Sequence, residues 1–194
     1  MNNPNVHLES IHKYLAVAAP EIDHINKIEK FSNGQSNPTY LLSTDRARYV
    51  LRSKPAGDLL KSAHAVEREY KVMKALKDTD VPVPRMLCLC ENEGVAGSIF
   101  FVMSYEEGRI FWDPALPRLS ASDRSILYTN KIRTLAALHS VDPSSVGLEG
   151  FGRMGNYFER QFNRWTTQYR ASETQKIAEM ETLIHWLTRH MPAD

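Results

Sequence analysis

The sequence has almost no net charge, only two cysteines and no long apolar run. Its 194 residues carry 24 lysines and arginines against 23 aspartates and glutamates, so no strong field exists to hold a nucleic-acid backbone or an anionic membrane. No apolar run approaches the roughly 18 residues that a membrane-spanning helix needs, and the first residues lack the pattern of a signal peptide. We therefore expect a soluble intracellular protein that binds neither nucleic acid nor membrane; cytoplasm, peroxisome and mitochondrion all stay open.

The two cysteines, Cys88 and Cys90, are two positions apart, which on a strand turns both thiols to one face. This spacing is neither a CxxC redox motif nor a zinc knuckle and favours packed, reduced thiols. The seven histidines have no metal-ligand spacing such as HExxH, and no GxSxG elbow occurs. We predict neither a metal site formed by these residues nor a serine hydrolase.

Hydrophobic residues make up 42% of the chain, enough to fill a core without metals or disulfides. Residues 8–18 have the spacing of an amphipathic helix that Pro20 ends, and residues 62–77 that of a second helix. Short β-like segments are expected at 28–31, 39–43, 48–52, 86–90 and 99–103. The close spacing of the first three predicts antiparallel hairpins in the order β-β-β-α-β-β.

After residue 103 the pattern changes, because Gly108, Pro114 and Pro117 break the run of strands. Helical spacing then covers residues 120–140, 157–169 and 173–190, with Ser120 as an expected cap and His139 as an expected core histidine. We predict a lead-in over residues 1–24, a first lobe over 25–107 and the start of a helical lobe over 108–194.

The most informative single residue is Glu69, which lies in the middle of the apolar stripe of the helix at 62–77. A carboxylate there is costly to bury unless a cation meets it, and Arg52 and Lys54 at the end of the preceding strand are the candidates. A basic group held in this way can face the phosphates of a nucleotide. The alternatives are a purely structural ion pair and a glutamate that lies merely at the edge of the stripe.

The turn at 32–37 lies between two β-segments and offers hydroxyls, amides and one glycine. Its N–H groups could fold over phosphate oxygens, or the turn could be an ordinary hairpin. Residues 150–155 satisfy GxGxxG, but no strand comes before them, so we interpret them as a loop. The aromatic and arginine-rich segment 157–169 has the helical spacing of a packing face; base stacking is the less favoured interpretation.

Five stretches together closely resemble the kinase-like domain that is fused to acyl-CoA dehydrogenases, within the aminoglycoside phosphotransferase and choline kinase superfamily. They are SNGQSNPTYLL, RYVLRSKPAGDLLKSAHAVEREYKVMKAL, VPVPRMLCLCENEGVAGSIFFVMSYEEGRIF, TLAALHSVD and LEGFGRMGNYFERQFNRWTTQY. The resemblance runs from about residue 25 to the last residue. It implies an α+β, protein-kinase-like fold, in which a five-stranded antiparallel sheet with one helix comes before a helical lobe.

The resemblance also implies a nucleotide site for ATP, or another nucleoside triphosphate, with Mg²⁺. The turn at 32–37 would cover the phosphates, and Glu69 would lie at the same end of the site. Arg52 stands where many relatives have lysine, so either Arg52 or Lys54 would contact the phosphates. A hinge from Met103 to Glu106 would bond the adenine edge. The full set of candidate residues is Gly34, Gln35, Ser36, Asn37, Val50, Arg52, Lys54, Glu69, Met103, Ser104, Tyr105 and Glu106.

The family's catalytic loop, HGDxxxxN, and the metal-binding aspartate that follows it do not occur in the 194 residues. We therefore expect this stretch to be inactive by itself, whereas a complete form would transfer the γ-phosphate of ATP to a small-molecule hydroxyl, such as that of a hydroxyacyl-CoA or a hydroxy acid. The alternative is a non-catalytic nucleotide-binding or interaction module whose apolar surface meets a covering partner or a second copy.

Overall fold

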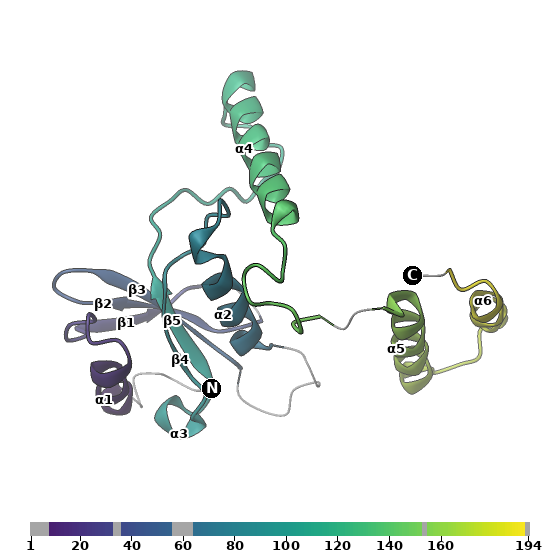
Figure 1. Cartoon of the computed structure of the whole chain (residues 1–194), viewed down its shortest axis with the longest axis horizontal. Helices are drawn as coiled ribbons and strands as arrows, with labels where there is room; N and C mark the ends of the chain where they lie inside the picture. The colour runs from purple at the N-terminus through teal and green to yellow at the C-terminus, as the bar shows by residue number, and fades with distance from the viewer. Residues whose placement is uncertain (1–7, 33–35, 56–63, 153–154, 193–194) are drawn as a thin grey trace. The chain divides into compact units, whose positions relative to one another are not determined.

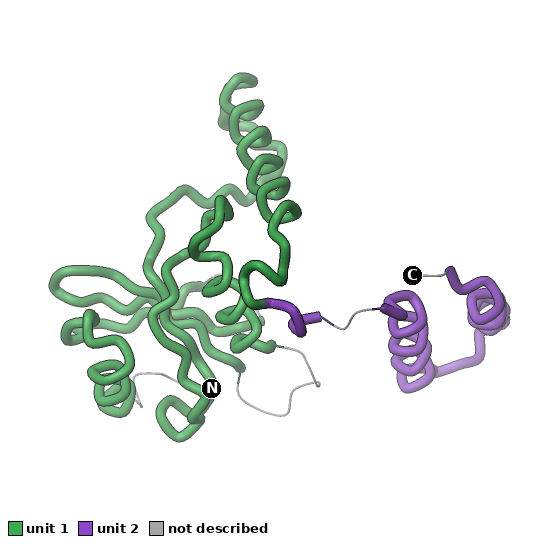
Figure 2. The backbone as a smooth tube through the Cα atoms, in the orientation of Figure 1, with its two compact units in different colours: residues 1–147 green, residues 148–194 purple. Residues whose placement is uncertain are grey.

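The computed structural model describes residues 8–32, 36–55, 64–152 and 155–192. The chain divides into two compact units, residues 1–147 and 148–194 (Figure 2). The first unit contains a β-sheet and its flanking helices, and the second contains two helices. These units are defined by contacts within the chain and do not test the lobe boundaries that we expect from the sequence. Those boundaries therefore stay a prediction.

The sheet has five antiparallel strands in the order β1-β2-β3-β5-β4 (Figure 1). The strands are β1 (Lys27–Lys30), β2 (Thr39–Ser43), β3 (Arg48–Ser53), β4 (Met86–Cys90) and β5 (Phe100–Ser104). Each lies within one or two residues of a predicted segment. The antiparallel sheet and the mixed fold class predicted from the sequence are confirmed.

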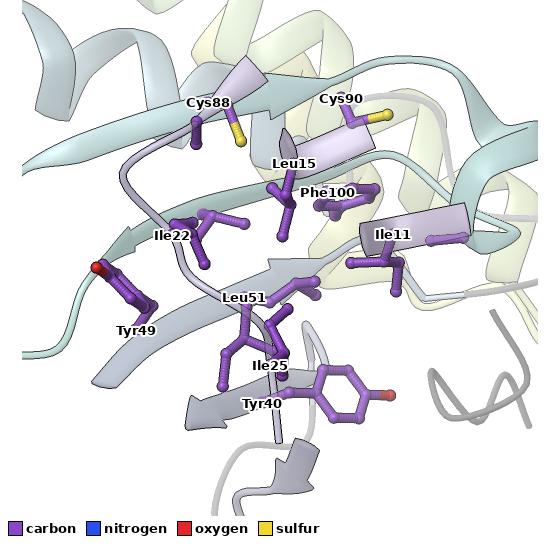
Figure 3. Packing of buried hydrophobic residues seen from close by; sticks show 14 residues of the cluster. Ile11, Leu15, Ile22, Ile25, Tyr40, Tyr49, Leu51, Cys88, Cys90 and Phe100 are labelled. Carbon is purple, nitrogen blue, oxygen red and sulfur yellow. The ribbon is translucent and has the colours of Figure 1, made fainter. Parts of the chain in front are cut away.

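One face of the sheet is covered by α1 (Leu8–Ala18), the helix predicted at the start of the chain. Ile11 and Leu15 of α1 are buried with Leu51 and Phe100 of the sheet in one core (Figure 3). The segment that we separated as a lead-in therefore shares its core with the strands. Apolar spacing predicted this helix but could not say which surface it covers.

The opposite face packs on α2 (Val66–Ala75), which continues into a short 3₁₀ helix over Leu76–Asp78. Val66 and Tyr70 of α2 form a second core with Phe101 of β5. Successive side chains of a strand point to opposite faces, so neighbouring Phe100 and Phe101 belong to different cores. We call the face on which Phe101 lies the α2 face.

Both thiols lie on the side of the sheet that α1 covers, as the spacing predicted. Cys88 and Cys90 are free and buried. Burial raises the pKa of the Cys88 thiol from 9.0 to about 12, which leaves it protonated and unreactive near neutral pH. The prediction that both thiols are packed in a core is confirmed.

The stretch 91–98, between the predicted β-segments at 86–90 and 99–103, contains a short helix, α3 (Glu93–Ala96). The side chain of Asn92 accepts a hydrogen bond from the N–H of Gly94 at 2.9 Å, and Gly97 ends the helix with φ of 74°. Asn before the first turn and Gly after the last are standard capping signals. Both capping residues are present in the sequence, but the segment between them is too short to show helical spacing.

The chain then forms a long helix, α4 (Ala121–Ser140), whose N-terminus is capped as predicted: the Ser120 hydroxyl accepts from the N–H of Asp123 at 3.1 Å. No residue of α4 is buried among the parts of the chain that are described. His139, which we expected in a core, is exposed. The apolar face predicted from the spacing is present, but no described element covers it.

The second unit contains α5 (Tyr157–Ser172) and α6 (Ala178–Arg189). Arg170 of α5 pairs with both carboxylate oxygens of Glu181 of α6, the Nη2–Oε2 distance being 2.6 Å. Tyr157 and Trp165 were predicted to pack and instead remain exposed. Among the described helices, none is both long and apolar enough to cross a lipid bilayer.

Candidate functional site

Several of the predicted site residues lie together on the α2 face of the sheet. Thr39 of β2 lies opposite Arg52 of β3, and Arg52 lies opposite Phe101 of β5. Val50 is two residues before Arg52 and therefore shares its face. Strand pairing thus brings a cation and an apolar surface into one row beside α2.

The predicted partner of Glu69 is Arg52. The guanidinium meets the carboxylate in a fork, with Nε 2.6 Å from Oε2 and Nη2 3.3 Å from Oε1. The two side chains are 29% and 35% exposed, so the pair is largely sheltered but reachable from solvent. A carboxylate on an otherwise apolar helix face is thereby balanced, which resolves its cost of burial.

The third donor nitrogen of Arg52 points toward the end of the turn at 32–37. Nη1 donates to the Thr39 hydroxyl at 3.0 Å and approaches the carbonyl oxygen of Asn37 at 3.5 Å. The Asn37 amide in turn donates from Nδ2 to Oε1 of Glu69 at 2.9 Å. The guanidinium is therefore held in one orientation by a strand, a helix and the end of the turn.

Lys54, the second cation that the sequence offered, follows β3 directly. Its backbone N–H donates to the carbonyl of Ile99 at 2.9 Å. Among the contacts of the described residues, none is made by its ammonium group, and the side chain is half-buried. Lys54 is thus not the partner of Glu69.

The predicted hinge, Met103 to Glu106, lies at the end of β5 and just after it. Val50 and Met103 are direct cross-strand partners, so their side chains lie next to each other on the α2 face. The backbone N–H of Ser104 donates to the carbonyl oxygen of Arg85 at 2.9 Å. The ring of Tyr105 lies under the Arg48 guanidinium, 4.4 Å from its carbon, and Glu106 is exposed.

Two predicted residues, Gly34 and Gln35, lie outside the described residues. Of the rest of that turn, Ser36 is exposed and Asn37 is 5% exposed. Sequence reasoning missed Thr39, and it missed His64, whose Nδ1 lies 2.9 Å from Oδ1 of Asn37. The period-two pattern of β2 could have placed Thr39 on this face; no sequence signal joined His64 to Asn37.

The GxGxxG stretch at 150–155 lacks the context of a dinucleotide site. The element before it is α4, and the sheet contains antiparallel pairs only among the described strands. A dinucleotide-binding loop requires a strand directly before it in a parallel unit. The described residues of this stretch, 150–152 and 155, lie in neither a helix nor a strand, as expected for a loop.

The profile of the phosphotransferase enzyme family matches residues 27–194. This chain belongs to that family. The phosphotransferase match begins at the first residue of β1 and continues through every described strand and helix after it.

Known relatives agree with the family assignment. This phosphotransferase chain is 48% identical to acyl-CoA dehydrogenase family member 10 of Mus musculus over 84% of its own length and 15% of that protein. It is 41% identical to acyl-CoA dehydrogenase family member 11 of Rattus norvegicus over 95% of its length and 24% of that protein. The chain thus spans less than a quarter of the length of either relative.

A solved structure is similar over nearly the whole chain. It is a crystal structure from Ralstonia eutropha, designated an aminoglycoside phosphotransferase, with 42% sequence identity and a TM-score of 0.77. The match covers 95% of this chain and 53% of that one. The kinase-like fold predicted from the sequence is confirmed by this neighbour.

A phosphotransferase site would be completed by Mg²⁺, a cation that binds oxygen ligands such as carboxylates. No group of three or more His, Cys, Asp or Glu side chains that could bind a metal ion occurs in the described part of the chain. Both carboxylate oxygens of Glu69 already accept hydrogen bonds from Arg52 and Asn37. Among the described residues, no side-chain cluster therefore provides a complete set of protein ligands for Mg²⁺.

Proposed function

We propose that residues 25–107 bind a nucleoside triphosphate, with ATP as the expected ligand, on the α2 face of the sheet. The observation that carries this proposal is the Arg52–Glu69 ion pair, held beside the end of the turn at 32–37. Arg52 keeps one Nη2 hydrogen that no described contact uses, on a guanidinium that is 29% exposed. A guanidinium fixed in this way offers a positioned positive charge for phosphate oxygens.

The base of the nucleotide would lie on Val50 and Met103. These two side chains form a continuous apolar surface across β3 and β5, which suits a planar ring. The backbone groups of Tyr105 and Glu106 take part in none of the loop and turn hydrogen bonds of the described residues, so they are available for the edge of the base. Gly34, Gln35 and Ser36 would cover the phosphates.

In its complete form, the protein would transfer the γ-phosphoryl group to a small-molecule hydroxyl. The hydroxyl oxygen forms a bond to the γ-phosphorus, the bond to the β,γ-bridging oxygen breaks, ADP leaves, and the hydroxyl proton passes to a base. The acyl-CoA dehydrogenase names of the relatives support a hydroxyacyl-CoA or hydroxy acid as the acceptor. Because residues 1–194 contain no HGDxxxxN sequence, we expect no phosphoryl transfer by this stretch alone.

The cation that meets the phosphates can be identified by substitution. Arg52→Lys is expected to weaken ATP binding about tenfold, because an ammonium cannot reproduce the fork to Glu69 together with the contact to Thr39. Lys54→Met is the matched control, with an expected loss of about threefold or less from a more distant charge. Titration calorimetry with ATP and Mg²⁺ gives both affinities.

Three possible results of this experiment would lead to different conclusions about the site. Absence of ATP binding by the unaltered chain would contradict the proposed nucleotide site as a whole. A larger loss for Lys54→Met than for Arg52→Lys would move the phosphate contact to Lys54. Equal affinity of all three proteins would leave the Arg52–Glu69 pair as a structural ion pair.

A second candidate function is an interaction module, and the apolar surface of the helices favours it. Large apolar side chains of α4 remain exposed, namely Ile126, Tyr128, Ile132, Leu135 and Leu138. In the second unit, an almost wholly apolar groove of about 420 Å³ lies between α5 and α6. Surfaces of this kind mark contacts with other chains, which here would be a covering partner or a second copy.

Self-association is tested by a matched pair of charge substitutions on α4. Ile132→Glu places a charge on the apolar face that Ile132 shares with Tyr128 and Leu135, and Asn130→Glu places the same charge on the other side of the helix, next to Ile126. If the chain forms dimers through α4, light scattering should show that Ile132→Glu shifts them to monomers while Asn130→Glu leaves them intact. A monomer at all concentrations would remove self-association.

A further inference from the structure

Asn37 uses both ends of its side-chain amide inside the site. Nδ2 lies 2.9 Å from Oε1 of Glu69, and Oδ1 lies 2.9 Å from Nδ1 of His64. The Glu69 carboxylate receives two bonds from Arg52 and acts only as an acceptor, so the amide nitrogen must face it and the amide oxygen must face His64. An amide oxygen cannot donate, which requires a hydrogen on Nδ1 of His64.

His64 also lies at a special place in the backbone. Its φ is 60°, in the left-handed region that non-glycine residues seldom adopt. Its carbonyl accepts from the N–H of Val66, the first residue of α2, at 2.9 Å. The residue at the cap position, Ala65, provides no side-chain bond to the helix. His64 therefore ties the start of α2 to the turn where a capping side chain is missing.

We propose that His64 is a positioning residue of the nucleotide site. It fixes Asn37, which fixes one oxygen of Glu69, which in turn orients the Arg52 guanidinium; we call this series His64–Asn37–Glu69–Arg52 the polar chain. The proposal rests on the proposed function, because the group finally positioned is the cation that would face phosphate. The proposal also gives Asn37 a structural role in the site, in place of the nucleotide contact that we predicted for it.

Burial supports this assignment of Asn37. The side chain is 5% exposed, and its two polar atoms are both engaged. A buried amide in a fully satisfied network costs little, whereas loss of one partner leaves a polar atom unpaired. Removal of the His64 ring would leave Oδ1 of Asn37 without its donor and loosen the next bond to Glu69.

The first test needs no nucleotide. Long-range proton–nitrogen correlation spectra of the uniformly labelled 194-residue chain identify which ring nitrogen of each neutral histidine carries hydrogen. We expect His64 in the Nδ1–H form, assigned by the loss of its signals in His64→Gly. A His64 ring protonated on Nε2 alone would overturn the polar chain, whether or not the protein binds ATP.

The second test uses two substitutions that both tolerate a positive φ. His64→Gly keeps the backbone conformation and removes the hydrogen-bond donor to Asn37. His64→Asn keeps both the conformation and a donor, because asparagine readily adopts a positive φ and its Nδ2 can replace Nδ1 of the histidine. We expect His64→Gly to weaken ATP binding about tenfold, the size of one lost buried hydrogen bond, and His64→Asn to recover most of it. Adenosine affinity should stay unchanged in both.

The outcomes distinguish this inference from the proposed function. Equal ATP affinities for the glycine and asparagine variants would overturn the positioning role while leaving nucleotide binding in place. Equal losses of ATP and adenosine would indicate general loosening of the fold and would also overturn it. If the unaltered chain binds no ATP, the proposed function fails, and the tautomer of His64 still decides whether the polar chain exists.

Discussion

Phe101→Ala is expected to destabilise the first unit by about 3–5 kcal/mol, the usual cost of truncating a buried aromatic side chain. Phe101 is fully buried, and its ring centroid lies 6.0 Å from that of Tyr70 on α2. The lost contact would loosen the helix that carries Glu69. Chemical denaturation gives the free energy of unfolding, and titration calorimetry gives the accompanying loss of ATP affinity.

Phe100→Ala is the matched control for this experiment. Phe100 is also fully buried and packs edge-to-face on Tyr14 of α1, with 5.8 Å between the ring centroids, on the opposite face of the sheet. We expect a similar loss of stability with little change in ATP affinity under conditions where both proteins are folded. Equal losses of affinity would show that the α2 face has no special role.

The second large effect is expected for Glu69→Ala. This change leaves the Arg52 guanidinium partly desolvated without its carboxylate and leaves the Asn37 amide without an acceptor. The expected cost is about 1–3 kcal/mol of stability, below that of a fully buried pair because both side chains keep about a third of their exposure. ATP affinity should fall as well, because the cation loses its orientation.

A double-mutant cycle separates the ion pair from other effects of this change. Glu69→Ala, Arg52→Ala and the double variant are compared by denaturation, and we expect the double variant to cost less than the sum of the single ones. Glu69→Gln keeps the shape and one acceptor oxygen, so its loss should be smaller. Additive single effects would mean that the fork between Arg52 and Glu69 contributes nothing in solution.

Much of the fold followed from local patterns. The segments of β1 to β5 and the helices α1, α2 and α4 are visible as apolar spacing and turn residues, because each element must bury one face. The two-residue spacing of Cys88 and Cys90 placed both thiols correctly for the same reason. The short helix α3 was missed because four residues give too little periodicity to detect.

The candidate site was only partly predictable. The sequence singled out Glu69 as a buried carboxylate in need of a cation, and it offered Arg52 and Lys54 without a choice between them. The choice was decided by strand pairing, which aligns Arg52 with Thr39 and Phe101 on the face that α2 covers. His64 could not be anticipated, since its contact with Asn37 joins residues that are 27 positions apart.

By itself, the sequence predicted the strands and the longer helices, their order and a carboxylate that would need a cation if it were buried. These are local properties, fixed by the period of apolar residues and by the cost of burying charge. The tertiary structure alone decided that β5 lies between β3 and β4, that α1 and α2 cover opposite faces, and which cation Glu69 binds. Such contacts join distant residues, and they depend on the packing of all elements at once.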